Sequence, residues 1–523
     1  MSLSSPCLPV VMPPTPTRAD PPITPSKQGH AEEQTTGTAL RLFMVIAVYA
    51  IPIVVSLRPV AYPIVDPDIW WHLRVGQWIV EHDSVPVTDP FSRYGLDKPW
   101  IAYSWLYEVL VFRLHEMFGL AGIVAYRVVL AVAVVAALHR LIGRREPRFL
   151  VATGLTAVTA LAVAPLLSER PWLFTILFTI LTVDVLLDLR AGRATRLVWL
   201  LPIVYALWAN VHIQFVYGLF LLGLACVAPL IDALLGRWRD DCGGPTLSWR
   251  IVLLTGLCAL ATLVNPYHEQ LYRVVLEYAT QPGPFRCVNE LRALEFREMC
   301  DWVMLVLGAW AVFALGKRQR LSSFETLLLV SAGIFAFRSR RDLWFLVLAA
   351  VAILATQNIR PIVASARFVL TPRRWALVTV ALAGLIVLIA WKRNLSAENL
   401  QQKVAGVFPV EAVAAIAEHG YEGPLYNDFN WGGFLIWNLP QLPVALDGRT
   451  NLHGDERILR IGNTWAAGPG WRDDPDLATA GVILADVQSP LGCVLILDDR
   501  FQLVYEDPIA RVFIRAPLHA RSR

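Results

Sequence analysis

The chain has 523 residues, of which 56% are hydrophobic and only 17% are charged. Soluble proteins carry about a quarter charged residues, so this composition indicates a polytopic membrane protein and excludes a soluble globular one. The net charge of +4 is small, and the arginines cluster in short loops between apolar runs, so the charge reports topology. We therefore expect a lipid bilayer as the surroundings and no nucleic-acid partner.

Residues 1–39 are rich in Pro, Thr and Ser and show no apolar periodicity. Such a segment buries too little apolar surface to offset the entropy lost on ordering, so we predict a disordered cytoplasmic tail. No small-residue cleavage site follows the apolar run that begins near residue 40. This run is therefore expected to remain as a first span, not to be removed as a signal peptide.

About eleven apolar runs approach the roughly 20 residues that one bilayer crossing needs. They lie near 40–57, 118–138, 149–167, 172–188, 196–212, 214–235, 250–265, 301–316, 322–337, 342–357 and 375–391. We therefore predict an α-helical membrane domain over residues 40–392 with about 11 transmembrane helices. The sequence shows no internal repeat of the kind that builds many transporters.

Arg and Lys accumulate in alternate loops, and this pattern predicts the orientation of the chain. The basic loops lie at 139–145, 190–196, 237–250, 317–320 and 360–374. The positive-inside rule places them in the cytoplasm, together with the N-terminus. The loops at 58–117, 168–171, 212–214, 266–300 and 338–341, and the domain after residue 392, are then expected outside.

The first external loop carries the sequence VDPDIWWHLR at residues 65–74. Residues three to four apart share a helix face, so a helix that begins here would bring Asp66, Asp68 and His72 near one another. An Asp-x-Asp pair offers oxygen ligands for Mg²⁺ or Mn²⁺ on a diphosphate, or a base for an incoming hydroxyl. The alternative is structural, with Asp66 as a helix N-cap, Asp68 favouring the helix dipole and His72 packing at the membrane interface.

The whole loop, 58–117, predicts two interfacial helices, at 69–81 and 103–118, joined by a turn-rich link near 85–92. Trp70 and Trp71 are expected at the depth of the lipid headgroups. A loop longer than about 12 to 15 residues usually has a function, although a lid without chemistry is an alternative here.

Further ionisable residues stand at the ends of spans on the same predicted side of the membrane. They are Glu169, Arg170, His212, His268, Glu269, Glu290, Arg338, Arg340, Arg341 and Asp342. Ionisable groups at span ends are costly unless they are paired or face water, so their convergence on one face predicts a shared polar cavity. Each has a structural alternative when taken alone, such as a local ion pair between Glu169 and Arg170.

The arginines at 338–341 form a basic cluster on the predicted outer face, against the positive-inside rule. A lipid phosphate is the expected partner, because Arg offers bidentate donors to phosphate oxygens and keeps its charge at any relevant pH. The alternative is pairing with Asp342 or with anionic headgroups.

Residues 393–523 change character, with Gly, Pro and Asp between short apolar stretches at 444–446, 482–484 and 512–514. Helix-like segments at 410–419 and 455–465 alternate with them. The pattern predicts a small extracytoplasmic α/β domain that ends in a hairpin near 503–508.

Two glycines in this domain, Gly432 and Gly433, predict a close backbone approach, and Asp447-Gly448 predicts a turn. The seven cysteines show no spacing typical of zinc sites. Cys287 and Cys300 fall on the same predicted external side, so a disulfide between them is a hypothesis.

The layout as a whole resembles the GT-C membrane glycosyltransferases. The motif at 66–74 (DPDIWWHLR) is similar to the first acidic motif of the oligosaccharyltransferase catalytic subunit. Residues 66–76 with Pro86, 89–92 (DPFS) and Trp105 resemble a group of bacterial GT-C-like proteins. The stretch 427–437 (NDFNWGGFLIW), followed by DGRT at 447–450, stands where oligosaccharyltransferases carry Trp-Trp-Asp. Here the sequence is Trp-Gly-Gly, so sequon recognition is not carried over.

This resemblance implies inverting transfer of a sugar from a polyprenyl-phosphate-linked donor to an unknown acceptor on the outer face of a bacterial inner membrane. Asp66 or Asp68 would deprotonate the acceptor or hold Mg²⁺ or Mn²⁺. The residues expected to bind substrate are His72, Arg74, Glu169, Arg170, His212, Arg338, Arg340 and Arg341. The alternatives are a polysaccharide ligase or polymerase with a different fold, and a non-enzymatic lipid or glycan transporter or assembly factor.

Overall fold

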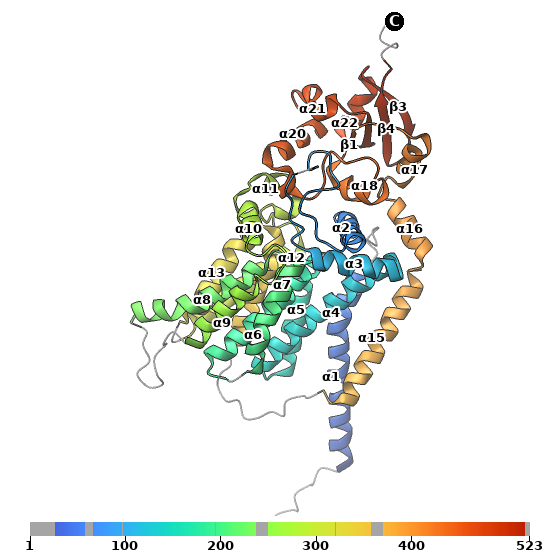
Figure 1. Ribbon diagram of the computed structural model, residues 1–523. Coiled ribbons are helices and arrows are strands. Elements are labelled where there is room, and N and C mark those ends of the chain that lie inside the picture. The colour runs from blue at the N-terminus through green and yellow to red at the C-terminus, as the bar shows by residue number, and fades with distance from the viewer. Residues whose placement is uncertain are drawn as a thin grey trace, which may run out of the picture.

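A computed structural model describes residues 27–57, 66–96, 98–193, 195–236, 249–318, 321–356 and 370–517, without the side chains of residues 27–36 and Cys287. Parts of the predicted tail (1–26) and of the first loop (58–65) therefore lie outside the described residues, as do most of the basic loops at 237–250 and 360–374. Helices make up most of the described chain, and one small sheet lies near the C-terminus (Figure 1).

Each of the predicted spans contains a helix. These helices are α1 (Lys27–Ser56), α4 (Leu120–Arg145), α5 (Phe149–Ala162), α6 (Trp172–Arg190), α7 (Leu201–Val211, after the 3₁₀ turn η2, Arg196–Leu200), α8 (Phe215–Leu234), α9 (Trp249–Ala261), α12 (Met299–Gly316), α13 (Ser323–Arg338), α14 (Leu343–Ala355) and α15 (Pro372–Lys392). Within the described ranges, six of them are long and apolar enough to cross a membrane: α1, α4, α6, α8, α12 and α15. The chain is thus a multi-pass membrane protein, and the count of eleven crossings stays a prediction.

The first helix begins earlier than expected. α1 starts at Lys27, inside the segment predicted to be disordered. The last proline of the tail is Pro25, and the residues from Lys27 onward include Ala, Glu and Gln, which favour helix over coil. α1 therefore overlaps the predicted tail over residues 27–39.

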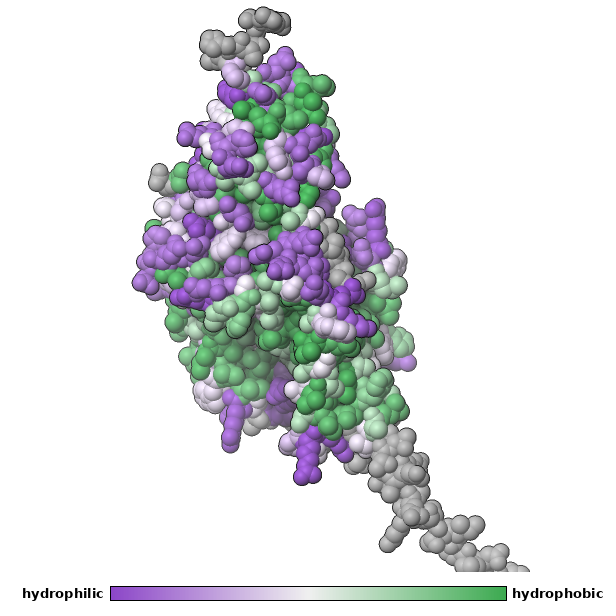
Figure 2. Space-filling model, turned by 90° about the vertical axis from the view of Figure 1, so that its right-hand side faces the viewer, coloured by the Kyte–Doolittle hydropathy of each residue, from purple (hydrophilic) through white to green (hydrophobic). Residues whose placement is uncertain are grey.

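Figure 1 shows α1 beside α4 and α15 at one edge of the bundle, with α15 leading up to the C-terminal domain. α14 lies inside the bundle, and every one of its residues is buried. Hydrophobic residues dominate the surface over the helical lower half of the molecule, whereas hydrophilic residues cover much of the upper half (Figure 2). This division is what a protein half embedded in lipid requires.

Two helices of the first loop, α2 (Ile69–His82) and α3 (Trp105–Phe118), lie between the bundle and the C-terminal domain (Figure 1). Their bounds agree with the prediction to within two residues. Their surroundings do not, because Trp70 and Trp71 are only 4% and 3% exposed. The indole of Trp70 packs edge-on against Phe408 and Phe434 of the C-terminal domain, so the predicted headgroup position of this pair is wrong.

Glycines allow α2 to pack closely on both sides. A Cβ on Gly76 of α2 would lie 2.1 Å from the backbone oxygen of Glu108 in α3. On the other side, a Cβ on Gly433 of α18 (Gly432–Asn438) would lie 2.9 Å from the backbone oxygen of Pro67. The close approach predicted from Gly432-Gly433 is confirmed, and its consequence is that the C-terminal domain sits directly on the acidic motif.

The C-terminal part contains a four-stranded sheet of order β1-β2-β4-β3, in which β1 and β2 are parallel and the other pairs antiparallel. The elements are α16 (Ala397–Ala405), α17 (Val410–His419), β1 (Leu425–Asn427), η5 (Phe429–Trp431), α18, α19 (Thr450–His453), α20 (Asp455–Trp465), η6 (Trp471–Asp473), α21 (Pro475–Ala478), β2 (Val482–Asp486), α22 (Pro490–Val494), η7 (Leu495–Leu497), β3 (Phe501–Glu506) and β4 (Ala510–Arg515). The expected hairpin is the β3–β4 pair.

One expected strand, at 444–446, is not formed. Only Val444 makes an isolated bridge, to Ser92 of the first loop. The side chain of Asn427 accepts a hydrogen bond from the N–H of Ala445 at 2.9 Å and donates to the carbonyl of Leu446 at 2.8 Å. These backbone groups are thus satisfied by a side chain and not by a neighbouring strand.

Candidate active site

A cavity of about 840 Å³ lies where the bundle helices, the first loop and the C-terminal domain meet. Four further short elements surround it: α10 (Gln270–Thr280), α11 (Gly283–Cys287), η3 (Asn289–Leu291) and η4 (Arg340–Asp342). Its polar lining includes Asp68, His72, Tyr103, Arg170, His212, Gln214, Tyr278, Asn289, Glu290, Arg338, Ser339, Arg341, Asp342, Asp428, Asn430 and Thr450. Residues from across the chain thus share one space, as the polar span ends predicted.

The predicted site residues separate into three groups. Asp68, His72, Arg170, His212, Arg338 and Arg341 line the cavity. Asp66 and Glu169 are buried and do not line it; Asp66 contacts Arg170 of the lining, and Glu169 contacts Asp66. Arg74 and Arg340 are not part of its lining.

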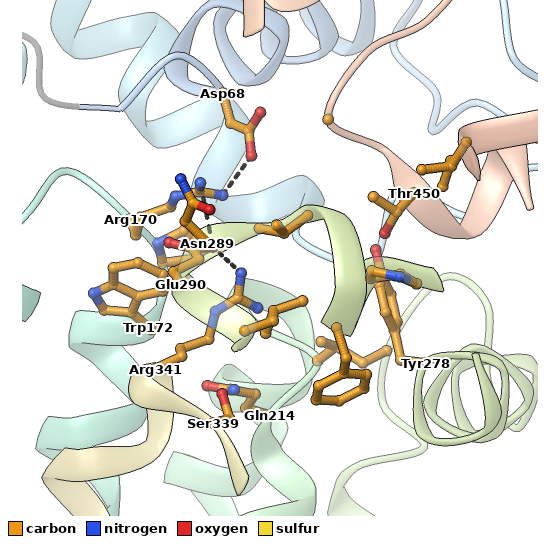
Figure 3. A pocket seen from close by; sticks show the side chains of 18 of the residues that line it. Asp68, Arg170, Trp172, Gln214, Tyr278, Asn289, Glu290, Ser339, Arg341 and Thr450 are labelled. Carbon is orange, nitrogen blue, oxygen red and sulfur yellow. Dashed lines mark hydrogen bonds and ion pairs between the residues drawn. The ribbon is translucent and has the colours of Figure 1, made fainter. Parts of the chain in front are cut away.

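The acidic motif is held by one arginine. Asp68 stands immediately before α2, and its carboxylate accepts a 2.5 Å hydrogen bond from Nη1 of Arg170 (Figure 3). Asp66 pairs with Nε of the same guanidinium, and its Oδ1 also accepts the backbone N–H of Asp68 at 2.9 Å. Asp66 therefore shapes the turn before the helix, as the structural alternative held, and also shares a cation with Asp68.

Glu169 does not pair with its neighbour Arg170. Its carboxylate accepts the backbone N–H of Asp66 at 2.9 Å and forms a 2.8 Å ion pair with Arg127 of α4. The hydroxyl of Tyr107 donates to the backbone carbonyl of Glu169. Glu169 thus ties the bundle, the acidic motif and α3 together, which indicates a positioning residue and not one that touches substrate.

A second carboxylate–guanidinium pair lies beside the first. Glu290 pairs with Arg341 and lies 3.6 Å from Nη2 of Arg170. The guanidinium carbons of Arg170 and Arg341 both lie 5.3 Å from the ring centroid of Trp172 (Figure 3). Burial by itself would raise the pKa of Glu290, but Arg341 and Arg170 hold it at about 2.

Asp68 differs from Glu290 in its proton affinity. Burial, with Glu290 and then Asp447 nearby, raises the pKa of Asp68 to about 7, whereas Trp71 and Arg341 oppose the shift. A carboxylate that titrates near neutral pH is suited to accept a proton from a substrate hydroxyl.

The two histidines of the site are held by hydrogen bonds to buried side chains. Nδ1 of His72 lies 3.1 Å from Oε1 of Glu108, and burial lowers the pKa of His72 and raises the pKa of Glu108. Nδ1 of His212 lies 2.7 Å from the hydroxyl of Thr175.

The basic cluster at 338–341 does not act as one unit, because Arg338 ends α13 whereas Arg340 and Arg341 belong to the short 3₁₀ turn η4, and their side chains have different partners. Arg341 reaches Glu290 in the cavity, and Arg338 stacks over Phe285, 4.6 Å from its ring centroid. Arg340 points away, with Glu298 at 4.0 Å. The prediction that Arg340 binds substrate is therefore not supported by its position.

Arg74 also lies outside the lining of the large cavity. It follows Asp68 by six residues, and at 100° per residue this places it on another side of α2. Its side chain donates a 2.8 Å hydrogen bond to Gln77 and lines a second cavity of about 240 Å³ with Trp78 and Phe91.

A buried ion cluster joins the first loop to the C-terminal domain. Arg449, only 1% exposed, donates to Asp89 at 2.5 Å and to Asp447 at 2.7 Å, and Nε2 of His453 lies 3.2 Å from Asp447. Asp89 also accepts the backbone N–H groups of Phe91 and Ser92, so it forms the turn of the DPFS segment. The sequence showed DPFS at 89–92 as part of the resemblance to GT-C-like proteins, but it did not predict that Asp89 pairs with Arg449.

The cluster also positions the backbone beside the acidic motif. Gly448 lies between Asp447 and Arg449, and a Cβ on it would be 2.0 Å from Oδ1 of Asp68. Only a glycine leaves room for the Asp68 carboxylate here.

Arg449→Met is expected to destabilise the protein by about 3–5 kcal/mol, because it leaves Asp89 and Asp447 buried without their cation. The expected readout is a lower thermal unfolding temperature in detergent and faster proteolysis of the first loop. The control is Arg113→Ala, which removes an ion pair to Glu116 in which both side chains are half exposed. Equal stability of the two variants would contradict the conclusion that the cluster holds the first loop and the C-terminal domain together.

A metal ion does not fit the acidic motif as it is arranged. Asp66 and Asp68 both hold the guanidinium of Arg170. Among the described residues, no group of three or more His, Cys, Asp and Glu side chains is placed to hold a metal ion. The Mg²⁺ or Mn²⁺ requirement stays a prediction, and no step below passes through a metal.

The predicted disulfide is not present. Cys300 is a free cysteine whose Sγ lies 3.6 Å from Oδ1 of Asp301. The side chain of Cys287 lies outside the part of the chain that the structure describes.

Several residues of the cavity were not predicted for the site. Glu290, Trp172, Tyr278 and Thr450 come from four separate segments. Two of them carried a signal in the sequence: Glu290 as an ionisable group in a predicted external loop, and Thr450 as the last residue of the DGRT stretch.

Comparison with known proteins finds no matching family model and no matching curated protein. The fold is nevertheless found among solved structures. The oligosaccharyltransferase AglB from Archaeoglobus fulgidus, in complex with an inhibitory peptide and a dolichol-phosphate, is 11% identical with a TM-score of 0.50, over 84% of this chain and 69% of that one. At this identity the likeness shows the fold alone, and the chain has a GT-C-like fold, which confirms the resemblance at that level.

Two further solved structures also match. An oligosaccharyltransferase structure from the same organism, tethered with an acceptor peptide, gives a TM-score of 0.48 at 11% identity, over 86% of this chain and 69% of that one. ArnT from Cupriavidus metallidurans, bound to undecaprenyl phosphate, gives 0.44 at 16% identity, over 91% and 98%.

Proposed function

We propose that the protein is a GT-C-type glycosyltransferase that transfers a sugar from a polyprenyl-phosphate-linked donor to a hydroxyl-bearing acceptor. The observation that carries this proposal is one cavity that joins a proton acceptor, Asp68, to the guanidiniums of Arg338 and Arg341 at the outer end of the bundle. This combination suits a reaction in which the acceptor hydroxyl gives its proton to a carboxylate while guanidiniums stabilise the departing phosphate. The AglB complex contains a dolichol-phosphate, a lipid phosphate of the class proposed here.

The cavity offers a separate surface to each part of the donor. Apolar side chains from α8, α10, α11 and α13 line its bundle side, namely Val216, Val275, Phe285 and Phe335, and would contact the lipid. Arg341 and Arg338 would bind the phosphate oxygens. Within the described residues, Oε1 of Gln214 and Oγ of Ser339 are buried without a hydrogen-bond partner, and Figure 3 shows both beyond Arg341, where sugar hydroxyls would satisfy them.

The C-terminal domain supplies the opposite wall, and we assign the acceptor to it. Asp428, Asn430 and Thr450 line this wall with hydrogen-bonding groups. The acceptor oxygen would attack the anomeric carbon and pass its proton to Asp68, while the bond from that carbon to the phosphate oxygen breaks. A single displacement of this kind inverts the anomeric centre and needs no covalent enzyme intermediate.

The test is a deletion strain in which glycans and polyprenyl-linked sugars are analysed by intact mass. Loss of one glycan with retained lipid-linked donor supports a transferase. Accumulation of the donor on the cytoplasmic side would instead identify a flippase, and an unchanged glycan profile would contradict the proposal.

We expect the N-terminus inside and the C-terminal domain outside a bacterial inner membrane. The basic residues Arg140, Arg144 and Arg145 stand at the end of α4, where Arg144 and Arg145 pair with Asp184 and Asp188 of α6. The positive-inside rule assigns this end to the cytoplasm. An alkaline phosphatase reporter fused to the C-terminus should be active, and the same reporter between α4 and α5 should be inactive. The reverse result would move the cavity to the cytoplasmic face.

A further inference from the structure

The guanidinium of Arg170 is surrounded by three carboxylates from two separate segments. Nε contacts Asp66, Nη1 contacts Asp68 at 2.5 Å and Nη2 lies 3.6 Å from Glu290. These carboxylates are 5%, 16% and 30% exposed, and Arg170 itself is 17% exposed. Every nitrogen of the guanidinium therefore faces an acidic oxygen in a largely enclosed place.

Arg170 is held in this position by the chain around it. The preceding residue, Glu169, is fixed by its ion pair to Arg127, and the following residues begin α6. The backbone carbonyl of Arg170 accepts a 3.2 Å hydrogen bond from the hydroxyl of Tyr126. Its guanidinium also lies over the ring of Trp172, whose Nε1 donates to the carbonyl of Leu166 at 2.7 Å. The position of Arg170 is therefore fixed by several buried contacts, unlike that of an arginine on an exposed surface.

Four of the six carboxylate oxygens around Arg170 already have a donor. Asp66 gives Oδ1 to the N–H of Asp68 and Oδ2 to Arg170. Asp68 gives Oδ2 to Arg170, and Glu290 gives Oε1 to Arg341 as well as Arg170. A Mg²⁺ ion that bridged the three carboxylates at its usual distance of about 2.0–2.1 Å would have to take the place of the guanidinium.

We infer that Arg170 occupies the position of a divalent cation in the acidic motif, and that its guanidinium supplies the positive charge so that the site binds no metal ion. A guanidinium keeps its charge at any relevant pH and matches carboxylates with a planar fork, so it is a permanent counter-charge for Asp66, Asp68 and Glu290. The inference that the acidic motif binds no metal ion does not depend on the proposed function. Its consequence, transfer that does not require a metal, rests on that function.

The experiment measures Mn²⁺ alone, by the electron paramagnetic resonance signal of free Mn²⁺, titrated into the full-length protein in lipid nanodiscs. Wild type is expected to show no saturable binding. Arg170→Met removes the charge and should open the three carboxylates, so this variant is expected to bind about one Mn²⁺ per chain, and Arg170→Met with Asp68→Asn should lose that site. Arg340→Ala, which removes a nearby arginine outside the cavity, should behave like wild type.

Saturable binding of one Mn²⁺ by wild type that Asp68→Asn abolishes would overturn the inference. So would a folded Arg170→Met variant, shown by its thermal unfolding, that binds no more Mn²⁺ than wild type. If Arg170→Met does not fold, the comparison of wild type with Asp68→Asn still decides the matter. EDTA should leave the wild-type transfer rate unchanged, and a chelation-dependent loss would contradict the consequence. A protein that shows no transfer at all would refute the proposed function but leave the Mn²⁺ result intact.

Discussion

Asp68→Asn is expected to lower the transfer rate by about 10²- to 10⁴-fold, the range that a positioned general base contributes. Asn keeps the shape of the side chain but cannot accept the proton of the acceptor hydroxyl. Arg170 retains Asp66 and Glu290 as partners, so the variant should fold and insert normally. The measurement is the rate of glycan transfer from a lipid-linked donor, with thermal unfolding recorded on the same preparation.

The pH profile distinguishes a base from a structural acid. Burial raises the pKa of Asp68 to about 7, and the ionised form is the active one. The wild-type rate should therefore fall as the pH decreases through about 7, and the residual rate of Asp68→Asn should lack this dependence. Asp66→Asn keeps a side-chain oxygen for the N–H of Asp68 and does not line the cavity, so its loss should be smaller.

The matched control is Asp83→Asn, the same chemical change at the other end of α2. Asp83 is exposed and has a φ of 47°, a backbone conformation that Asn adopts readily. Its rate should equal that of wild type. Near-wild-type rates in both Asp66→Asn and Asp68→Asn would mean that the acidic motif only shapes the start of α2.

Arg341→Ala is expected to weaken binding of the lipid-linked donor by about ten- to a hundredfold. A hydrogen bond to a charged group contributes about 1.5–3 kcal/mol, and a guanidinium offers the phosphate two such bonds in one plane. Arg341→Lys should restore only part of the affinity, because it keeps the charge but loses the bidentate geometry. The measurement is a titration of polyprenyl phosphate and of the sugar-linked donor against each purified variant.

The neighbouring residue provides the control. Arg340 is 39% exposed, faces Glu298 at 4.0 Å and does not line the cavity, so Arg340→Ala should leave donor affinity unchanged. Equal affinities in wild type, Arg341→Ala and Arg340→Ala would remove Arg341 from the donor site and leave it as the partner of Glu290.

Local features of the sequence were sufficient for the class of protein and for most elements. Long apolar runs predicted the helices of the bundle, because the cost of exposing backbone groups in lipid imposes helix on any such run. Alternation and turn residues predicted the hairpin of β3 and β4. Arg170 and Arg341 were found for a different reason: charged side chains at span ends need a shared polar space, and they have one. Asp68 was found from the Asp-x-Asp spacing of the motif at 65–74.

The errors arose where neighbours in sequence were assumed to act together. Arg74 and Arg340 were predicted with Asp68 and Arg341, but the turn of a helix sends nearby side chains to different sides. Trp70 and Trp71 resemble interfacial anchors in the sequence, and only the packing of α18 against α2 shows that protein and not lipid covers them.

The charge pairing of the site was decided by the tertiary structure alone. Asp89 of the first loop forms an ion pair with Arg449, and Arg170 forms ion pairs with Asp68 and Glu290. The partners are separated by roughly a hundred residues or more in the sequence. The pairing of charged side chains depends on how far each group is removed from water and on its distance from every other charge. Neither quantity can be read from a short stretch of sequence. The sequence therefore determined that acidic and basic groups would share one polar space, and the packing of the C-terminal domain on the first loop determined that an arginine stands between the carboxylates.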